Sequence, residues 1–191
     1  MGHVIAVDLG ATRTRVAIVS EGGRIEKRSE APTPAKETDP SRLTGFLSNL
    51  IADIWEETKP EPITGIGLSV AGPVDIRKGM LVNPPNMAFR DVPLSLPISR
   101  IFHCPVRMVN DCHAGVLGEM FYGQGRGRSD VVYLTVSTGI GGGVVSGGRI
   151  LLGRKGNAAE IGHFHVDSTY DLPCGCGCTG HWEGYASGKY M

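Results

Sequence analysis

Hydrophobic and polar positions near the start of the chain predict a small antiparallel sheet. Residues 3–8 and 14–19 are rich in Val, Ile and Ala, and each segment predicts a strand. The segment 9–13 between them predicts a short connecting loop. The glycine pair within 21–23 predicts a turn, so residues 24–28 are expected to add a third strand.

A helical pattern follows this sheet. Asp39 is expected to cap the helix, with Pro40 at its first position. Apolar side chains then recur at helical spacing, at Leu43, Phe46, Leu47, Leu50, Ile51, Ile54 and Trp55. This pattern predicts a helix that packs one face against the sheet.

Strands and helices alternate farther along the chain. Strands are expected at 63–70, 106–109, 131–137 and 144–145, and a helix at 111–122. This order predicts an α/β protein with two lobes around a cleft.

The glycine-rich segment 123–127 is the expected joint between the lobes. Residues 1–122 would then form the N-terminal lobe, and residues 123–191 would begin the second lobe.

Composition narrows the possible functions. The 19 Lys and Arg residues balance the 19 Asp and Glu residues, which argues against nucleic-acid binding through a basic surface. The N-terminus lacks the pattern of a signal peptide, and the uncharged segment 131–148 contains too many glycines for a membrane helix. We expect a cytoplasmic protein without a membrane or nucleic-acid partner.

Two glycine-containing segments are typical of phosphate binding. Residues 8–12 place a carboxylate, a glycine and a threonine hydroxyl at the end of a predicted strand. Residues 138–143 place four glycines after the strand at 131–136. Each segment alone also fits an ordinary hairpin or bulge. Their occurrence after separate strands favours phosphate.

Asn110 and Asp111 stand at a predicted junction between a strand and a helix. Phosphoryl transfer to an alcohol needs a carboxylate within hydrogen-bonding reach of the attacking hydroxyl, and Asp111 could supply it. The alternative is that Asp111 only caps the helix.

The five cysteines are unevenly distributed. Three lie within 174–178, whereas Cys104 and Cys112 stand apart and are expected to be small core residues. Such crowding favours a metal site in a reducing compartment over a disulfide framework.

A closed set of Cys and His ligands is typical of structural zinc. Cys174 and Cys176 flank a glycine, and His163 precedes them at a distance that allows a loop to close. The fourth ligand could be His181 or Cys178, because the spacing allows both. The alternative is a group of thiols without metal.

Taken in order, the motifs of this chain resemble those of the ROK family of sugar kinases and related repressors. The resemblance runs through 8–12, 65–67, 72–75, 85–86, 110–111, 138–143, 160–163 and 180–183. The last of these motifs, Gly-His-Trp-Glu, resembles archaeal glucokinase-like and hexokinase-like members.

The resemblance implies an actin-like ATPase (ribonuclease H-like) fold and transfer of phosphate from ATP-Mg²⁺ to the 6-hydroxyl of a hexose. Asp111 would be the general base. The residues implied to bind the sugar are Asn86, Asn110, Asp111, Glu160, His163 and Glu183. The residues implied to hold the phosphates are Gly10, Thr12, Thr138, Gly139, Gly141 and Gly142. Asp8 would reach Mg²⁺, and His163 would also ligate a structural Zn²⁺.

The resemblance leaves several functions open. Glucokinase or broad-specificity hexokinase is the leading expectation, and N-acetylmannosamine or fructose kinase is the alternative. Family members continue beyond Met191, so we expect an incomplete second lobe, and a non-catalytic fragment that binds sugar and zinc is a further alternative. A repressor is disfavoured because nothing basic precedes the first strand. The full-length form is expected to be a dimer or tetramer.

Overall fold

The structure is a computed structural model that describes residues 2–58 and 62–190. The chain divides into two compact units, residues 1–111 and 112–191. The expected boundary was at 122/123, after the helix rather than near its start. The helix goes with the second unit because its first turns pack closely on the strands that follow it, as the glycine contacts below show.

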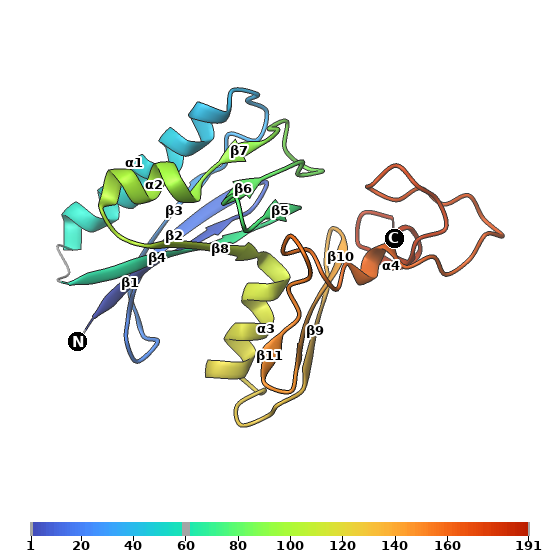
Figure 1. Cartoon of the computed structure of the whole chain (residues 1–191). Helices are drawn as coiled ribbons and strands as arrows, with labels where there is room; N and C mark the ends of the chain where they lie inside the picture. The colour runs from blue at the N-terminus through green and yellow to red at the C-terminus, as the bar shows by residue number, and fades with distance from the viewer. Residues whose placement is uncertain (1, 59–61, 191) are drawn as a thin grey trace. The chain divides into compact units, whose positions relative to one another are not determined.

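A five-stranded mixed sheet forms the centre of the first unit (Figure 1). Its strands, in spatial order, are β3 (Ile25–Pro32), β2 (Arg13–Ser20), β1 (His3–Leu9), β4 (Ile63–Val70) and β8 (Val106–Asn110). The first three are antiparallel, and β1, β4 and β8 run parallel. The predicted strands are confirmed here, with ends that differ by a few residues.

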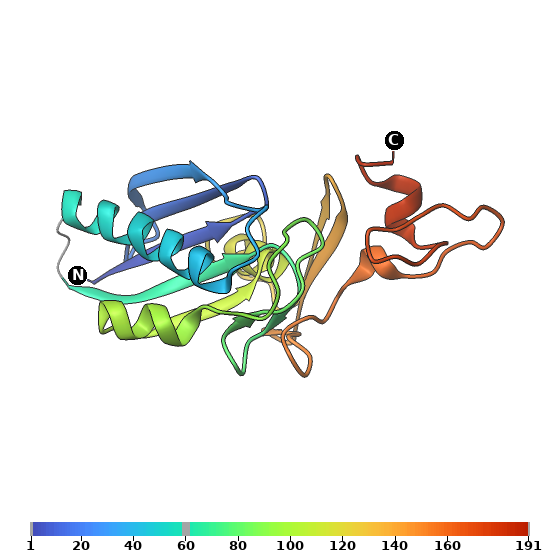
Figure 2. The same cartoon turned by 90° about the horizontal axis from the view of Figure 1, so that it is seen from above.

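Two helices cover one face of this sheet. Helix α1 (Pro40–Thr58) begins at the predicted proline, and the Ser41 N–H donates to Asp39 Oδ1 at 2.9 Å. Helix α2 (Ser95–Phe102) was not predicted from the sequence. It has only eight residues and contains Pro97. A helix accepts proline in its first turn because the backbone N–H groups there have no partner within the helix, so a missing N–H costs no hydrogen bond. Figure 2 shows α1 and α2 side by side.

The core of the first unit lies between the sheet and these helices. Along β1, Ile5, Val7 and Leu9 are buried while the residues between them are more exposed, as expected for a strand with one face on the core. A small second sheet, in the order β5-β6-β7, completes the unit. Its strands are β5 (Val74–Asp75), β6 (Met80–Leu81) and β7 (Val92–Pro93).

The second unit contains a helix and a three-stranded antiparallel sheet in the order β11-β10-β9. The elements are α3 (Asp111–Tyr122), β9 (Val131–Val136), β10 (Ile140–Ser146) and β11 (Arg149–Ile150). The short 3-10 helix η1 (Ile161–His163) and helix α4 (Trp182–Ala186) follow. Helix α3 has the predicted bounds.

Strand β10 begins four residues earlier than predicted and includes three of the four glycines that were expected to form a loop. The strand forms there because Ile140 through Val145 pair in register with β9. Only residues 137–139 remain between the two strands. None of the helices in the described part of the chain has the length and apolar character that crossing a membrane requires.

Candidate functional site

The β1–β2 hairpin places Asp8 and Thr12 at the end of two strands in the first unit. Thr33 supports its turn: the Thr33 hydroxyl donates to the Gly10 carbonyl at 2.7 Å, and the Thr33 N–H donates to the Thr12 carbonyl at 3.0 Å. A β carbon on Gly10 would lie 2.9 Å from the Arg13 carbonyl oxygen. The turn is therefore tight and well supported, and it leaves Thr12 exposed. Sequence reasoning missed Thr33, which no local pattern links to this turn.

Asp8 is the first of three charged residues that form a row across β1, β2 and β3. Its Oδ2 accepts a hydrogen bond from Arg15 Nη1 at 3.0 Å, and Arg15 Nε lies 3.5 Å from Glu30 Oε2. The strand register brings these residues side by side, because Asp8 pairs with Arg15 and Arg15 pairs with Glu30. Since all three side chains are about half exposed, the row contributes little to stability. Its effect is to orient the Asp8 carboxylate.

Asn110 and Asp111 lie where β8 ends and α3 begins. Asn110 is buried, and its Nδ2 donates to the Gly72 carbonyl at 3.3 Å, in the loop that follows β4. Parallel strands β4 and β8 end together, with Val70 opposite Asn110. Asp111 is partly exposed as the first residue of α3. The carboxylate is thus held at the carboxyl edge of a parallel sheet, where α/β proteins commonly bind ligands.

The loop after β4 also approaches the segment that carries Asn86. Gly72 has a φ of 128°, and a β carbon there would lie 3.0 Å from Pro84 Cβ. Asn86 itself is exposed two residues farther on. The motifs at 72–75, 85–86 and 110–111, distant in sequence, therefore lie at one edge of the first unit.

The glycines of β10 are packing positions. A β carbon would lie 2.6 Å from Cys112 Sγ at Gly141, 2.7 Å from Ile161 Cδ1 at Gly142, and 2.3 Å from the Cys112 carbonyl oxygen at Gly143. The sequence suggested phosphate contacts for Gly141 and Gly142. These positions have no room for a side chain because α3 and η1 approach the strand closely there.

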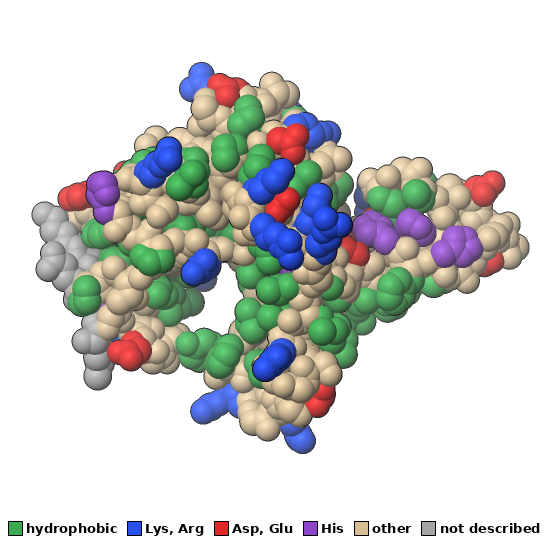
Figure 3. Space-filling view, in the orientation of Figure 1, with side chains coloured by type: hydrophobic (Ala, Val, Ile, Leu, Met, Phe, Trp, Pro, Cys, Tyr) green, Lys and Arg blue, Asp and Glu red, His purple; other side chains and the backbone are tan. Residues whose placement is uncertain are grey.

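His163, in η1, faces two groups. Its Nδ1 lies 3.3 Å from Cys174 Sγ, and its Nε2 lies 4.0 Å from Glu160 Oε2. One ring nitrogen therefore faces the cysteines while the other lies beside the carboxylate that was expected to bind sugar. This arrangement fits the expected double role of His163. Figure 3 shows histidine side chains gathered on the surface of the segment after β11.

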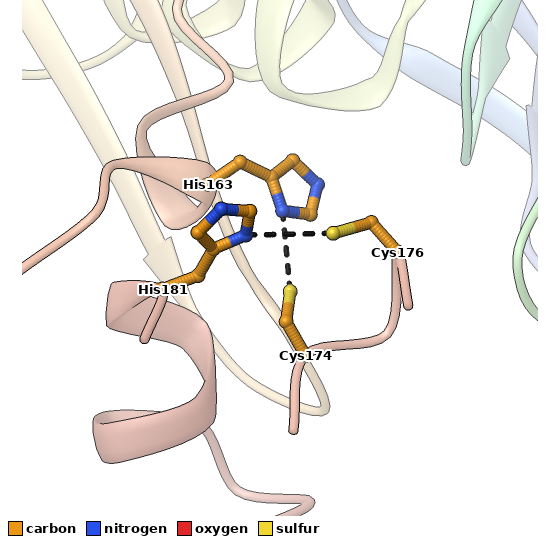
Figure 4. A group of neighbouring side chains, drawn as sticks. All are labelled: His163, Cys174, Cys176 and His181. Atoms are coloured by element: carbon orange, nitrogen blue, oxygen red, sulfur yellow. Dashed lines mark hydrogen bonds between the residues drawn. The ribbon is translucent and has the colours of Figure 1, made fainter. Parts of the chain in front are cut away.

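Four side chains from the second unit converge on one point (Figure 4). The ligand atoms of His163, Cys174, Cys176 and His181 all lie within 4.8 Å of one another. Cys176 Sγ lies 3.4 Å from His181 Nδ1. Cys178 is exposed and lies outside this group. Of the two candidates for the fourth position, the fold therefore brings in His181.

The donor set suits zinc. A tetrahedral ion with Zn–N bonds of about 2.0–2.1 Å and Zn–S bonds of about 2.3 Å would set its ligand atoms roughly 3.3–3.8 Å apart. The two short contacts, at 3.3 and 3.4 Å, are both between a nitrogen and a sulfur, and they are about 0.2 Å shorter than the roughly 3.55 Å edge that such a pair would have around the ion. Burial raises the pKa of the Cys174 thiol to about 12, and the adjacent Glu183 carboxylate adds to the shift. A cation at this point would displace the proton, since thiolate is the binding form.

Glu183, in the first turn of α4, makes several hydrogen bonds within the unit. Its Oε2 accepts from the Ile140 N–H at 3.1 Å, and its Oε1 accepts from the Gly175 N–H at 3.1 Å and from Cys174 Sγ at 3.3 Å. Burial favours a higher pKa for Glu183, but these hydrogen bonds outweigh burial and lower the pKa. Both oxygens of a residue expected to bind sugar are therefore used by the protein itself.

Comparison with known proteins gives consistent matches. The glucokinase of Aeropyrum pernix is 42% identical over 194 residues, and the N-acetylmannosamine kinase of Shigella boydii is 37% identical over 188 residues. These alignments cover 100% and 97% of this chain but 58% and 61% of the relatives. The chain thus spans about three fifths of the length of the curated relatives it matches.

A solved structure agrees with the expected fold. The ROK family glucokinase of Streptomyces griseus, in complex with glucose and AMPPNP, superimposes with a TM-score of 0.85 at 34% identity. The match covers 99% of this chain and 58% of that one. The α/β, actin-like ATPase fold predicted from the sequence is confirmed. Because the ROK family profile matches residues 4–191, this chain belongs to the ROK family.

Proposed function

We propose that this chain provides the sugar- and phosphate-binding residues of an ATP-dependent hexose kinase, a glucokinase or a broad-specificity hexokinase. The observation that carries the proposal is the position of Asp111 beside buried Asn110, at the carboxyl edge of β4 and β8, in a chain 42% identical to a glucokinase.

In the proposed reaction, the Asp111 carboxylate accepts the proton of the sugar 6-hydroxyl. The hydroxyl oxygen forms a bond to the γ-phosphorus of ATP while the bond to the bridging oxygen breaks, so that sugar 6-phosphate and ADP result. Hydrogen bonds to the other sugar hydroxyls would come from Asn86, Asn110, Glu160, His163 and Glu183, and these would orient the sugar. Catalysis would then rest mainly on positioning.

The β1–β2 turn and the tip of the β9–β10 hairpin would hold the phosphates. Thr12 and Thr138 are exposed at these two turns and offer hydroxyl donors. Asp8, a hard oxygen donor, would hold Mg²⁺, which supplies charge neutralisation for the phosphates. The solved Streptomyces griseus relative contains glucose and AMPPNP, which supports a nucleoside triphosphate as donor.

The Cys and His group would hold a structural Zn²⁺ through His163, Cys174, Cys176 and His181. Four ligands from the chain leave no position for a reacting water, as in other structural zinc sites. The ion would fix the ring of His163 and so help to shape the sugar site.

The N-acetylmannosamine kinase at 37% identity supports a second candidate, phosphorylation of an amino sugar derivative. Sugar-dependent release of ADP, measured with glucose, mannose, fructose and N-acetylmannosamine, tests both. Release is expected to be greatest with glucose under the leading proposal, and with N-acetylmannosamine under the alternative. If the chain neither binds any of these sugars nor releases ADP with any of them, both candidate functions are contradicted.

A further inference from the structure

Glu183 connects two parts of the second unit that are far apart in sequence. Its Oε2 binds the N–H of Ile140, at the start of β10, across 43 positions of the chain. Its Oε1 binds the N–H of Gly175 and lies 3.3 Å from the sulfur of Cys174, one of the four proposed zinc ligands. A single carboxylate therefore contacts both the hairpin tip and the metal-binding turn.

The segment after Glu183 also forms hydrogen bonds with the β9–β10 hairpin. The Gly188 N–H donates to the Ser137 carbonyl at 2.7 Å, and the Lys189 N–H donates to the Thr138 carbonyl at 3.3 Å. A β carbon on Gly139 would lie 2.5 Å from Glu183 Oε2, so a side chain at this position would displace the Glu183 carboxylate. Residues 137–140, which we call the hairpin tip, are thus held by 183–189.

These contacts explain Glu183 better than direct sugar binding alone does. Oε1 accepts from Gly175 and Cys174, and Oε2 accepts from Ile140, so only Oε2 keeps a lone pair that a sugar hydroxyl could use. Charge-assisted hydrogen bonds to two backbone N–H groups hold a carboxylate in one orientation. The orientation that serves Gly175 also presents the second oxygen to Ile140.

We propose that Glu183 is a positioning residue that couples metal binding at His163, Cys174, Cys176 and His181 to the order of the hairpin tip. An ion that fixes Cys174 also fixes the adjacent Gly175 N–H, and Glu183 passes this constraint to Ile140. The inference rests on the proposed function, in which Thr138 and Gly139 at the tip meet the phosphates. Zinc loss would then weaken the binding of nucleotide as well as of sugar.

Hydrogen exchange of individual amides, followed by NMR, tests the coupling without any need for catalysis. In the wild-type chain, removal of zinc with a chelator is expected to speed exchange of the Ile140 amide roughly tenfold or more, the factor for loss of a hydrogen bond to a charged group. The amide of Gly147, at the opposite end of β10, is expected to change little.

The variant Glu183→Gln has nearly the same size but replaces one acceptor oxygen with an NH₂ group, so it cannot accept from both backbone groups. We expect it to bind zinc, with fast exchange at Ile140 that no longer responds to zinc. Asp130→Asn is the matched control. Asp130 Oδ1 accepts from the Gly147 N–H at 3.0 Å, at the far end of the same hairpin. This control should speed exchange at Gly147 and keep the zinc response at Ile140.

Equal protection of Ile140 with and without zinc would overturn the coupling, as would a zinc response that survives in Glu183→Gln. Parallel loss of protection at Gly147 would also overturn it, because the whole hairpin would then depend on the metal. A wild-type chain that takes up no zinc would overturn the coupling together with the metal assignment. A zinc response at Ile140 without sugar binding or ADP release would support the coupling and contradict only the proposed kinase function.

Discussion

Gly143 lies so close to Cys112 that a β carbon on it would be 2.3 Å from the Cys112 carbonyl oxygen. Strand β10 can therefore pack against the first turn of α3 only where it lacks a side chain. The same approach recurs at Gly115 of α3, where a β carbon would lie 2.7 Å from Tyr133 Cε1 on β9. Much of the glycine content of this region thus serves the packing of helix on sheet, next to Asp111.

Gly143→Ala is expected to destabilise the second unit, because the new methyl group meets backbone that cannot move away without distorting α3. Overpacking of this kind typically costs about 1–3 kcal/mol of unfolding free energy. Urea unfolding followed by circular dichroism measures the loss.

Gly118→Ala is the control for that variant. Gly118 is exposed in α3, and nothing lies within 4 Å of the position of its β carbon. Alanine there should raise stability by about 0.5–1 kcal/mol, the usual gain over glycine in a helix. Equal effects of the two substitutions would contradict the packing explanation.

Asp111→Asn is expected to lower the rate of sugar phosphorylation by about 10²–10⁴-fold, the usual contribution of a general base. Sugar affinity should remain within a few-fold of wild type, because the amide keeps the shape of the carboxylate. Turnover is measured by ADP release and affinity by calorimetry. Glu119→Gln, in the same helix, is the control and should behave as wild type. A variant of Asp111 with nearly full turnover would assign the base to another residue.

Cys176→Ser is expected to abolish stoichiometric zinc binding. Loss of a group that only supports a ligand typically lowers metal affinity roughly 10–100-fold, and loss of the ligand itself should lower it further. Sugar affinity should fall with it, because His163 serves both sites. Zinc is quantified by mass spectrometry and sugar affinity by calorimetry. Cys178→Ser, two residues away and outside the four-residue group, should keep both. The opposite result would make Cys178 the ligand.

Asp39→Ala is expected to lower the melting temperature of the first unit by a few degrees at pH 7, because α1 loses its N-cap. Hydrogen bonds from the Ser41 N–H and hydroxyl lower the pKa of Asp39 below its ordinary value of 3.8. The ionised carboxylate therefore stabilises the folded state at pH values above its ordinary pKa. This contribution disappears as the pH falls through the lower pKa of the folded state.

The difference in melting temperature between Asp39→Ala and wild type should accordingly shrink below about pH 4. Scanning calorimetry between pH 3 and 7 measures it. Glu37→Ala, an exposed acid outside the helix, is the control and should differ little from wild type throughout. A difference for Asp39 that stays constant with pH would show that the carboxylate does not act as a charged cap.

Several features of the fold could be predicted from sequence because they depend on neighbouring residues. The start of α1 follows from Asp39 and Pro40, and the bounds of α3 follow from its junction at Asp111 and the glycine-rich segment after Tyr122. Helix α2 escaped prediction because eight residues with an internal proline give too short a pattern. The early start of β10 escaped it because glycines carry no strand preference, and pairing with β9 decides the matter.

The sequence by itself determined the family and the main strands and helices, and it supplied the residues that we propose carry the chemistry. The strands and helices follow from local periodicity and capping, which act over a few residues, whereas the family follows from the resemblance of the motifs taken in order. Tertiary structure alone decided that His181 joins the Cys and His group, that Thr33 supports the β1–β2 turn, and that Glu183 spans the hairpin tip and the metal-binding turn. The physical reason is that each of these contacts joins segments whose distance is set by packing, which the order of residues along the chain does not encode locally.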